Sequence, residues 1–239
     1  RSAMSAKHEW LNLVDVSGPF LAVPVLREVF PQGLDELDTA RAQRLRSAYE
    51  EWREAVDGDD AAVEALHRAW IDEVLQTALD IDESMLRRAE GIPVAAISEH
   101  PEHDHRINPD LAIVDPTRGD AVLCPIHVFP PDADLEASMR FGGLTCSPAD
   151  RMALHLRALG QPLGVVTNGE RWMLVHAPVG QVSGFASWYA RLWAQEPDTL
   201  RALGSLLGAR RFFAPEQERL PKLYERSLKH QDEVTDALG

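Results

Sequence analysis

The chain has 239 residues, of which 45% are hydrophobic, enough for one sizeable core with added helical segments. Its formal net charge of -14, from 38 acidic against 24 basic residues, opposes tight nucleic-acid binding by the chain as a whole, because such binding requires lysine and arginine to neutralise phosphates. Its two cysteines exclude a disulfide framework. No apolar run is long enough for a membrane span and no secretory signal pattern begins the chain, so we expect a cytoplasmic protein without a membrane partner.

Two amphipathic helices are predicted in the N-terminal third. Apolar and aromatic residues recur at helical spacing from Asp38 to Val56 and again from about Ala61 to Leu79. After Gly91 a short apolar run predicts a strand over Ile92–Ile97, followed by a polar loop over Ser98–Ile107.

The predicted loop contains the segment Glu99-His-Pro-Glu-His-Asp-His105, in which imidazoles and carboxylates alternate closely. Imidazole together with carboxylate suits zinc, nickel or manganese, so His105 is a candidate metal ligand. The alternative is a solvated connector without a ligand.

Two apolar runs flank the turn Pro116–Gly119 and predict a β-hairpin whose first strand begins with a Pro-Asp pair at Asp110. Folding the hairpin about the middle of this turn places Asp110 opposite Pro125. Residues two apart in a strand share a face, so Asp110, His127 and Phe129 are expected to point the same way. The alternative is a surface hairpin in which Pro-Asp merely opens a strand.

The second half of the chain predicts a helix, a second hairpin and further helices. A serine N-cap followed by proline begins the helix and a glycine closes it, while Asn168-Gly169 is a strong hairpin turn. The expected elements are a helix from Ser147 to about Leu159, strands over Pro162–Thr167 and Arg171–Ala177, and helices from Ser183 to the end.

Six large aromatic residues in the C-terminal region carry more apolar surface than a short helix needs. We expect part of this region to pack on the sheet and part to form a docking face for a following domain; the alternative is that all six belong to the core. The residues are Phe185, Trp188, Tyr189, Trp193, Phe212 and Phe213. The helical pattern still continues at Leu238, so we expect a longer protein.

The predicted order of elements and the Pro-Asp hairpin together resemble the restriction-endonuclease-like fold of PD-(D/E)xK nucleases. The segments Leu163–Val175, Gly184–Tyr189 and Leu206–Phe213 are similar to the N-terminal domains of bacterial type IIG restriction-modification proteins that carry an adenine-specific DNA methyltransferase. The resemblance implies an α/β fold with an αβββαβ core and a mixed sheet over residues 60–180. It also implies an N-terminal helical segment over 1–59 and a C-terminal helical extension over 181–239.

The resemblance also implies a site. In such nucleases an aspartate and a glutamate hold Mg²⁺ or Mn²⁺, and a lysine acts on the phosphate. Asp110 matches the aspartate, whereas His127 stands at the glutamate position and Phe129 at the lysine position. Glu73 is a further candidate acid on the preceding helix, with a surface role as its alternative, and His105 a further ligand. Because imidazole is a poor Mg²⁺ ligand and phenyl is none, we expect a degenerate site that is inactive in this chain alone.

The function implied is a nuclease-like, DNA-handling domain of a phage-defence restriction-modification methylase. Its partners would be DNA, the methyltransferase domain and other defence subunits. S-adenosylmethionine would bind only in the methyltransferase domain, because this chain lacks the Asn/Asp-Pro-Pro-Tyr/Phe tetrad. The alternative is a catalytically silent scaffold that docks on the methyltransferase or on a partner subunit. Either way, we expect no DNA cleavage and weak binding to duplex DNA.

Overall fold

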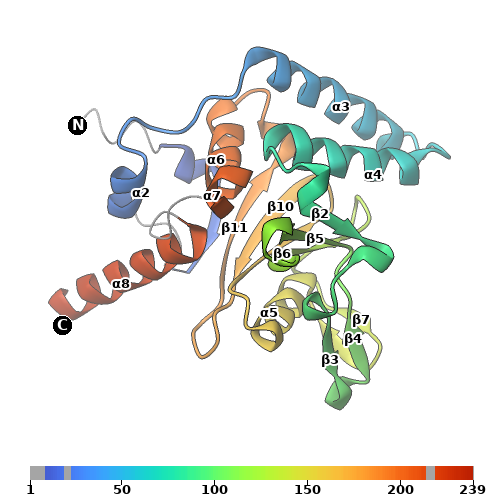
Figure 1. The fold of residues 1–239 in the computed structure, drawn as a ribbon. Helices are drawn as coiled ribbons and strands as arrows, with labels where there is room; N and C mark the ends of the chain where they lie inside the picture. The colour runs from blue at the N-terminus through green and yellow to red at the C-terminus, as the bar shows by residue number, and fades with distance from the viewer. Residues whose placement is uncertain (1–8, 19–22, 214–218, 239) are drawn as a thin grey trace. The chain divides into compact units, whose positions relative to one another are not determined.

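The computed structural model describes residues 9–18, 23–213 and 219–238, which form a mixed α/β protein (Figure 1). The chain divides into two compact units: Arg1–Asp80 with Gly184–Gly239, here called the helical unit, and Ile81–Ser183, here called the sheet unit. The predicted N-terminal and C-terminal segments therefore share one unit. The helix that precedes the first strand of the sheet belongs to this unit as well.

The sheet unit is built on a mixed sheet with the spatial strand order β10-β9-β6-β5-β2. Its strands are β2 (Leu86–Arg88), β5 (Leu111–Asp115), β6 (Ala121–Val128), β9 (Leu163–Thr167) and β10 (Arg171–His176). The β6–β9 pair is parallel, with His127 in register with Val166, while the other pairs are antiparallel. The parallel pair requires a crossover, which α5 (Pro148–Leu159) supplies.

Helix α5 and the second hairpin follow the sequence prediction closely. The Ser147 side chain accepts a hydrogen bond from the Asp150 N–H and caps the first turn. Gly160, at φ 69°, ends the helix in the left-handed conformation that glycine adopts without strain. The turn between β9 and β10 contains Gly169 at φ 88°. Both predictions are confirmed because they rest on local backbone chemistry.

The predicted strand over Ile92–Ile97 is wrong. The segment contains the 3₁₀ turn Val94–Ala96 and follows another, Ala89–Gly91, and Pro93 between them has no N–H to donate to a neighbouring strand. The apolar side chains are nevertheless buried. They form a cluster that comprises Ile92, Ala96, Ala112, Val114 and Val122. The first strand of the sheet is instead β2.

The predicted loop over Ser98–Ile107 is also wrong, because it folds as a hairpin of β3 (Ser98–His100) and β4 (His105–Ile107). A second hairpin, β7 (Met139–Phe141) with β8 (Leu144–Cys146), lies against it. A Cβ on Gly143 would lie 2.4 Å from the His103 carbonyl oxygen. Only a glycine allows this backbone approach, which fixes the two hairpins to each other beside α5 (Figure 1).

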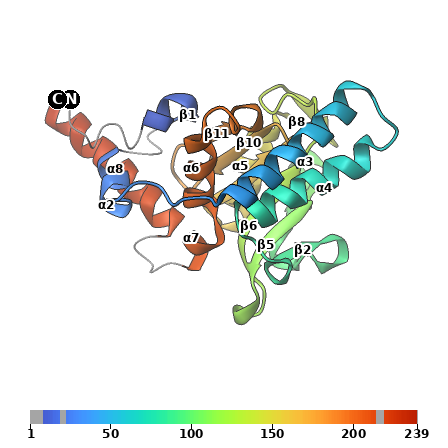
Figure 2. The ribbon, with the colours of Figure 1, turned by 90° about the horizontal axis from the view of Figure 1, so that it is seen from above.

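The helical unit contains an antiparallel helix pair and a buried aromatic cluster. Its elements are β1 (Asp15–Ser17), α2 (Val23–Val29), α3 (Thr39–Asp57), α4 (Val63–Glu73), a π-helical turn Val74–Ala78, β11 (Gly184–Tyr189), α6 (Pro197–Leu207), α7 (Ala209–Phe213) and α8 (Leu220–Leu238), with 3₁₀ turns at Glu9–Leu13 and Ala190–Leu192. Helices α3 and α4 lie side by side (Figure 2). Between them Trp52 and Trp70 stack with ring centroids 5.8 Å apart, which confirms both predicted helices.

The helix predicted from Ser183 is wrong at its start, because Gly184–Tyr189 forms β11 and pairs with β1. Of the six aromatic side chains proposed for packing or docking, three are buried: Trp188, Trp193 and Phe212. Trp193 packs against Trp70, with ring centroids 6.1 Å apart. The Phe185 and Tyr189 side chains are half-buried, and the Phe213 side chain lies outside the described set. Three of the six therefore belong to the core of this unit.

Among the residues described, none of the helices combines the length and the apolar character that a membrane-spanning segment needs.

Candidate functional site

The β5–β6 hairpin brings Asp110 beside His127. Leu111 pairs with Ile126, and the Asp110 N–H donates to the Ile126 carbonyl over 3.0 Å. The Asp110 carboxylate accepts a hydrogen bond from the Val128 N–H at 2.7 Å. Continuing this register places Asp110 opposite His127 across the hairpin.

The predicted pairing of Asp110 with Pro125 is wrong, because Pro125 pairs with Ala112. The turn extends to Asp120, one residue further than predicted, and the longer turn shifts the register by one residue. The Asp120 carboxylate accepts hydrogen bonds from the Nε and an Nη of Arg87, at 2.9 and 2.8 Å. A bulge at Leu123 shifts the register by one more. Because the two shifts add to an even number, the predicted face of Asp110 is unchanged.

His127 lies in the interior rather than at the surface, with a relative exposure of 0%. Its Nδ1 lies 3.4 Å from Nη1 of Arg151, and its ring lies 5.2 Å from that of His155. Burial, followed by the charge of Arg151, holds the pKa of His127 well below its ordinary value. His127 is therefore a neutral imidazole that accepts from, or lies against, a guanidinium.

Phe129, at the position where a nuclease lysine is expected, supplies no charge. Its N–H donates to the Thr167 carbonyl at 2.8 Å, and its ring meets Phe141 edge-on with centroids 6.2 Å apart. Phe141 belongs to β7, so this aromatic pair connects the edge of the sheet to the second hairpin.

The cation of the site is Arg151 on α5, which the sequence analysis missed. Its Nε donates to Nε2 of His105 at 3.2 Å, and its guanidinium carbon lies 4.6 Å from the centre of the Phe141 ring. A signal was present: Arg151 lies one turn from the N-terminus of α5, where the helix dipole disfavours a positive charge. Such a conflict with local preference often marks a functional position.

Further imidazoles line the inside of this cluster. The Ser98 hydroxyl bonds with Nδ1 of His155 at 2.6 Å and with Nε2 of His100 at 2.8 Å. Burial, with Arg151 second, lowers the pKa of His155 to about 4. Nε2 of His127 and Nε2 of His155 are buried without a hydrogen-bond partner. The His-rich segment is therefore split: His100 and His105 bond within the cluster, whereas the His103 side chain is 40% exposed and lies 3.9 Å from Glu102.

Asp110 and Arg151 influence each other across this site. Asp110 keeps some exposed surface. Partial burial of its carboxylate nevertheless raises its pKa above the ordinary value, although the hydrogen bond from the Val128 N–H and the charge of Arg151 both act to lower it. Burial lowers the pKa of Arg151, and Asp110 acts in the opposite direction. Burial also lowers the pKa of His105, with Arg151 as the next cause. The cluster is thus one cation among neutral imidazoles, with one carboxylate nearby.

The residues of this site do not fit a divalent cation. Mg²⁺ and Mn²⁺ prefer several oxygen ligands, and the cluster offers one carboxylate, an oxygen of which already binds a backbone N–H. Nowhere in residues 9–18, 23–213 and 219–238 do three or more His, Cys, Asp or Glu side chains converge as a metal site would require. His127 and His105 instead accept hydrogen bonds from, or lie against, Arg151.

Glu73, the further candidate acid, is the last residue of α4 in the helical unit. Nε of Arg44 lies 2.5 Å from its carboxylate, and the Thr77 hydroxyl donates to it at 2.9 Å. Nη2 of Arg44 donates to the second carboxylate oxygen at 3.5 Å, so both oxygens are engaged within that unit.

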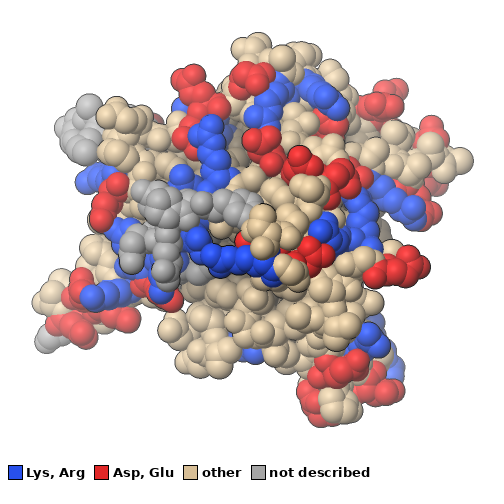
Figure 3. Space-filling model, viewed as in Figure 1, with Lys and Arg blue, Asp and Glu red and all other residues tan. Residues whose placement is uncertain are grey.

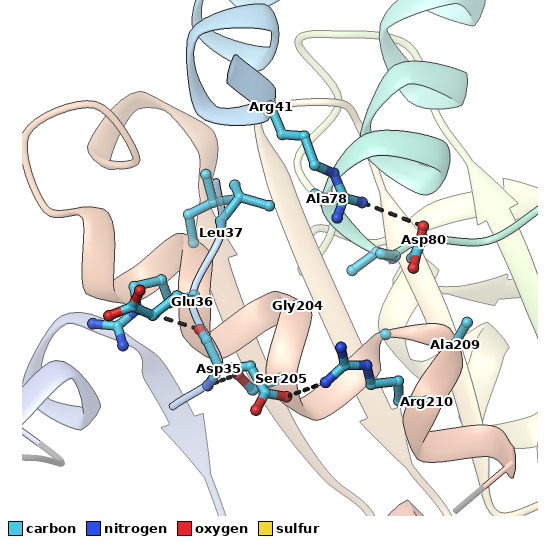
Figure 4. Close-up of a pocket in the computed structure, with 14 residues that line it drawn as sticks. Asp35, Glu36, Leu37, Arg41, Ala78, Asp80, Gly204, Ser205, Ala209 and Arg210 are labelled. Atoms are coloured by element: carbon cyan, nitrogen blue, oxygen red, sulfur yellow. Dashed lines mark hydrogen bonds and ion pairs between the residues drawn. The ribbon is translucent and has the colours of Figure 1, made fainter. Parts of the chain in front are cut away.

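A pocket of about 80 Å³ lies in the helical unit (Figure 4). Two ion pairs line it: Arg41 with Asp80 at 3.4 Å and Arg210 with Asp35 at 3.9 Å. The Asp35 N–H donates to Ser205 Oγ at 2.9 Å. The cations Arg41 and Arg210 are thus already engaged by carboxylates of the same pocket.

Comparison of the chain with protein-family models, with curated proteins and with solved structures yields no match.

Proposed function

We propose that the chain is a restriction-endonuclease-like domain with a disabled nuclease centre, which handles DNA within a restriction-modification adenine methyltransferase and does not cut it. The observation that carries the proposal is the strand edge at Asp110. A nuclease needs a second acid and a lysine there, and this chain has the buried His127 and the packed Phe129.

The order of elements supports the fold part of the proposal. Along the chain, α4, β2, β5, β6, α5 and β9 follow the αβββαβ order, and the strands form a mixed sheet. Asp110 directly precedes β5, and extending the pairing of Leu111 with Ile126 by one residue sets it across from His127, an arrangement that is compatible with the proposed fold.

The chemistry supports the loss of cleavage. Phosphodiester hydrolysis in such nucleases uses metal ions to activate water and to stabilise charge on the phosphate. One exposed carboxylate does not form such a site, and His127 has no solvent-facing surface with which to join it. We therefore assign to this domain DNA contact or positioning, and any DNA modification to the methyltransferase domain with its S-adenosylmethionine.

A second candidate function is a scaffold that docks on the methyltransferase or on a partner subunit. The net charge of -14 favours it, and basic and acidic side chains are interspersed over the face in view (Figure 3). Few phosphates could then be neutralised by this chain alone.

The test combines cleavage and binding. Supercoiled plasmid is incubated with the chain in Mg²⁺, Mn²⁺ and Ni²⁺, and we expect no nicking above that of Asp110→Ala. Duplex binding is followed by fluorescence anisotropy, and we expect weak binding that fades near ~0.15 M salt. Metal-dependent cutting that disappears in Asp110→Ala would overturn the disabled centre. An absence of DNA binding even at low salt would favour the scaffold.

A further inference from the structure

Arg151 differs from the other partly buried arginines of the sheet unit in the side chains that it contacts. Arg87 pairs with Asp120 at 2.8 Å, and Arg171 pairs with Glu136 at 2.8 Å. In the part of the chain that the structure describes, no carboxylate lies within ion-pair distance of Arg151. Its hydrogen-bond partners are two imidazoles, which burial keeps neutral.

This arrangement orients the cation without neutralising it. A guanidinium has five N–H donors, and one N–H meets each of His105 and His127. The Phe141 ring covers one face at 4.6 Å. Nη2 makes no hydrogen bond to a described residue, yet it is not among the buried unpaired nitrogens, so it reaches solvent. A half-buried charge without a carboxylate partner costs stability, and a bound anion would offset that cost.

We infer that Arg151, held between His105 and His127 on the face of Phe141, is a binding site for one phosphate group, which its free guanidinium edge contacts. A planar guanidinium matches a phosphate with two parallel N–H···O bonds. The position of Arg151 near the N-terminus of α5 adds positive potential. That the phosphate belongs to a DNA strand rests on the proposed function above, whereas the phosphate site itself does not.

Asp110 tunes this site. Its negative charge stabilises the charged form of Arg151 and repels an incoming anion. One of its oxygens accepts a hydrogen bond from the Val128 N–H. Replacement by asparagine keeps the size of the side chain and removes the charge. An anion site therefore becomes stronger in Asp110→Asn, whereas a metal site at the same carboxylate becomes weaker.

The experiment titrates inorganic phosphate into the protein and follows the arginine Nε–H resonances by NMR. We expect one arginine resonance, absent from Arg151→Gln, to shift. Followed on the backbone amide resonances of His105 and Phe141, the affinity of that variant should be lowered at least about tenfold, as the loss of a bidentate charged contact predicts. Arg157→Gln is the matched control, because Arg157 lies on the same helix and is exposed, donating to the Gln181 carbonyl, and it should bind as the parent chain does. Arg151→Lys keeps the charge and loses the fork, so we expect an intermediate affinity.

Asp110→Asn provides a second, independent test of the phosphate site if Arg151→Gln does not fold. Phosphate affinity that rises about threefold or more in Asp110→Asn supports the site. Phosphate binding that is absent from the parent chain, that is equal in Arg151→Gln and Arg157→Gln, or that falls in Asp110→Asn overturns it.

A DNA-binding experiment distinguishes the phosphate site from the proposed DNA-handling function. Duplex and single-stranded oligonucleotides are compared, and we expect Arg151→Gln to weaken binding several-fold and to lower the slope of log affinity against log salt by about 1. If phosphate binds at Arg151 and DNA does not bind, the phosphate site stands and the DNA-handling function fails. If DNA binds equally to Arg151→Gln and to Arg157→Gln, the function stands and the assignment of Arg151 to a DNA phosphate fails.

Discussion

Two groups of arginines, one in each unit of the molecule, are held by different partners. In the helical unit Arg41 meets Asp80 and Arg44 meets Glu73, so these two cations have carboxylate partners. In the sheet unit Arg151 meets His105 and His127, which hold it in place as neutral acceptors. Paired charges stabilise a surface modestly. A cation held by neutral groups keeps its capacity to bind an anion, so the pairing of charges locates a site better than their number does.

The largest expected effect is acid unfolding controlled by the buried imidazoles of the sheet unit. The pKa of His155 is about 4 in the folded protein, below the ordinary value of about 6.5. The unfolded chain therefore takes up the proton first, and stability present at neutral pH is lost as the pH falls from about 6.5 towards 4. The span corresponds to about 3 kcal/mol.

Urea unfolding at pH 7 and pH 5 measures this loss in the parent chain and in His155→Gln. The variant should lose less stability between the two pH values, and His103→Gln, which removes a 40% exposed imidazole, is the matched control. An equal pH slope in parent and His155→Gln would contradict the burial assigned to His155.

Charge reversal at one arginine of each unit tests whether the two units respond differently. Arg151→Glu places two carboxylates in one partly buried cluster and should lower the free energy of unfolding by about 2 kcal/mol. Arg41→Glu removes an exposed pair and adds an acid to the first turn of α3, which the helix dipole favours, so the loss should stay below about 1 kcal/mol. Chemical denaturation of both variants checks this, and equal losses would remove the distinction.

The smallest effect is a pH dependence of anion affinity. Enclosure raises the pKa of Asp110 above 3.8, so the carboxylate loses its charge earlier than usual as the pH falls, and binding of sulfate at Arg151 should strengthen. We expect the affinity for sulfate to rise as the pH is lowered from 7 to 5. Sulfate keeps its charge over this range. Asp110→Asn should bind more tightly at pH 7 and show a smaller pH dependence than the parent chain; a full parent response would contradict the role of Asp110.

Local backbone chemistry made part of this structure predictable. Ser147 caps α5 as expected, since its side chain bonds to the first helical turn. Asp38 caps α3 in the same way, which the sequence analysis did not predict. The Gly169 turn gave the β9–β10 hairpin. The hairpin that carries Asp110 was predicted, and its face was right although its register was not.

The remainder depended on contacts between segments distant in the sequence. Ile92–Ile97 carries the apolar content of a strand but lies on the sheet as turns, because Pro93 interrupts a ladder and Ala112 and Val114 receive its side chains. A bulge leaves Leu123 without a partner in the strand pairing, and no residue pattern near it predicted the bulge. Arg151 was missed since its partners come from β4, β6 and β7, which only the tertiary structure assembles.

The most direct test of the disabled nuclease centre is whether a divalent cation binds at Asp110. Mn²⁺ is titrated into the isotopically labelled chain, and paramagnetic broadening of the Asp110, His127 and Val128 amide resonances is compared between the parent chain and Asp110→Ala. We predict no site-specific broadening in either, because one carboxylate bonded to a backbone N–H does not form a Mn²⁺ site. Saturable broadening at these amides that disappears in Asp110→Ala would show a metal centre and contradict the account.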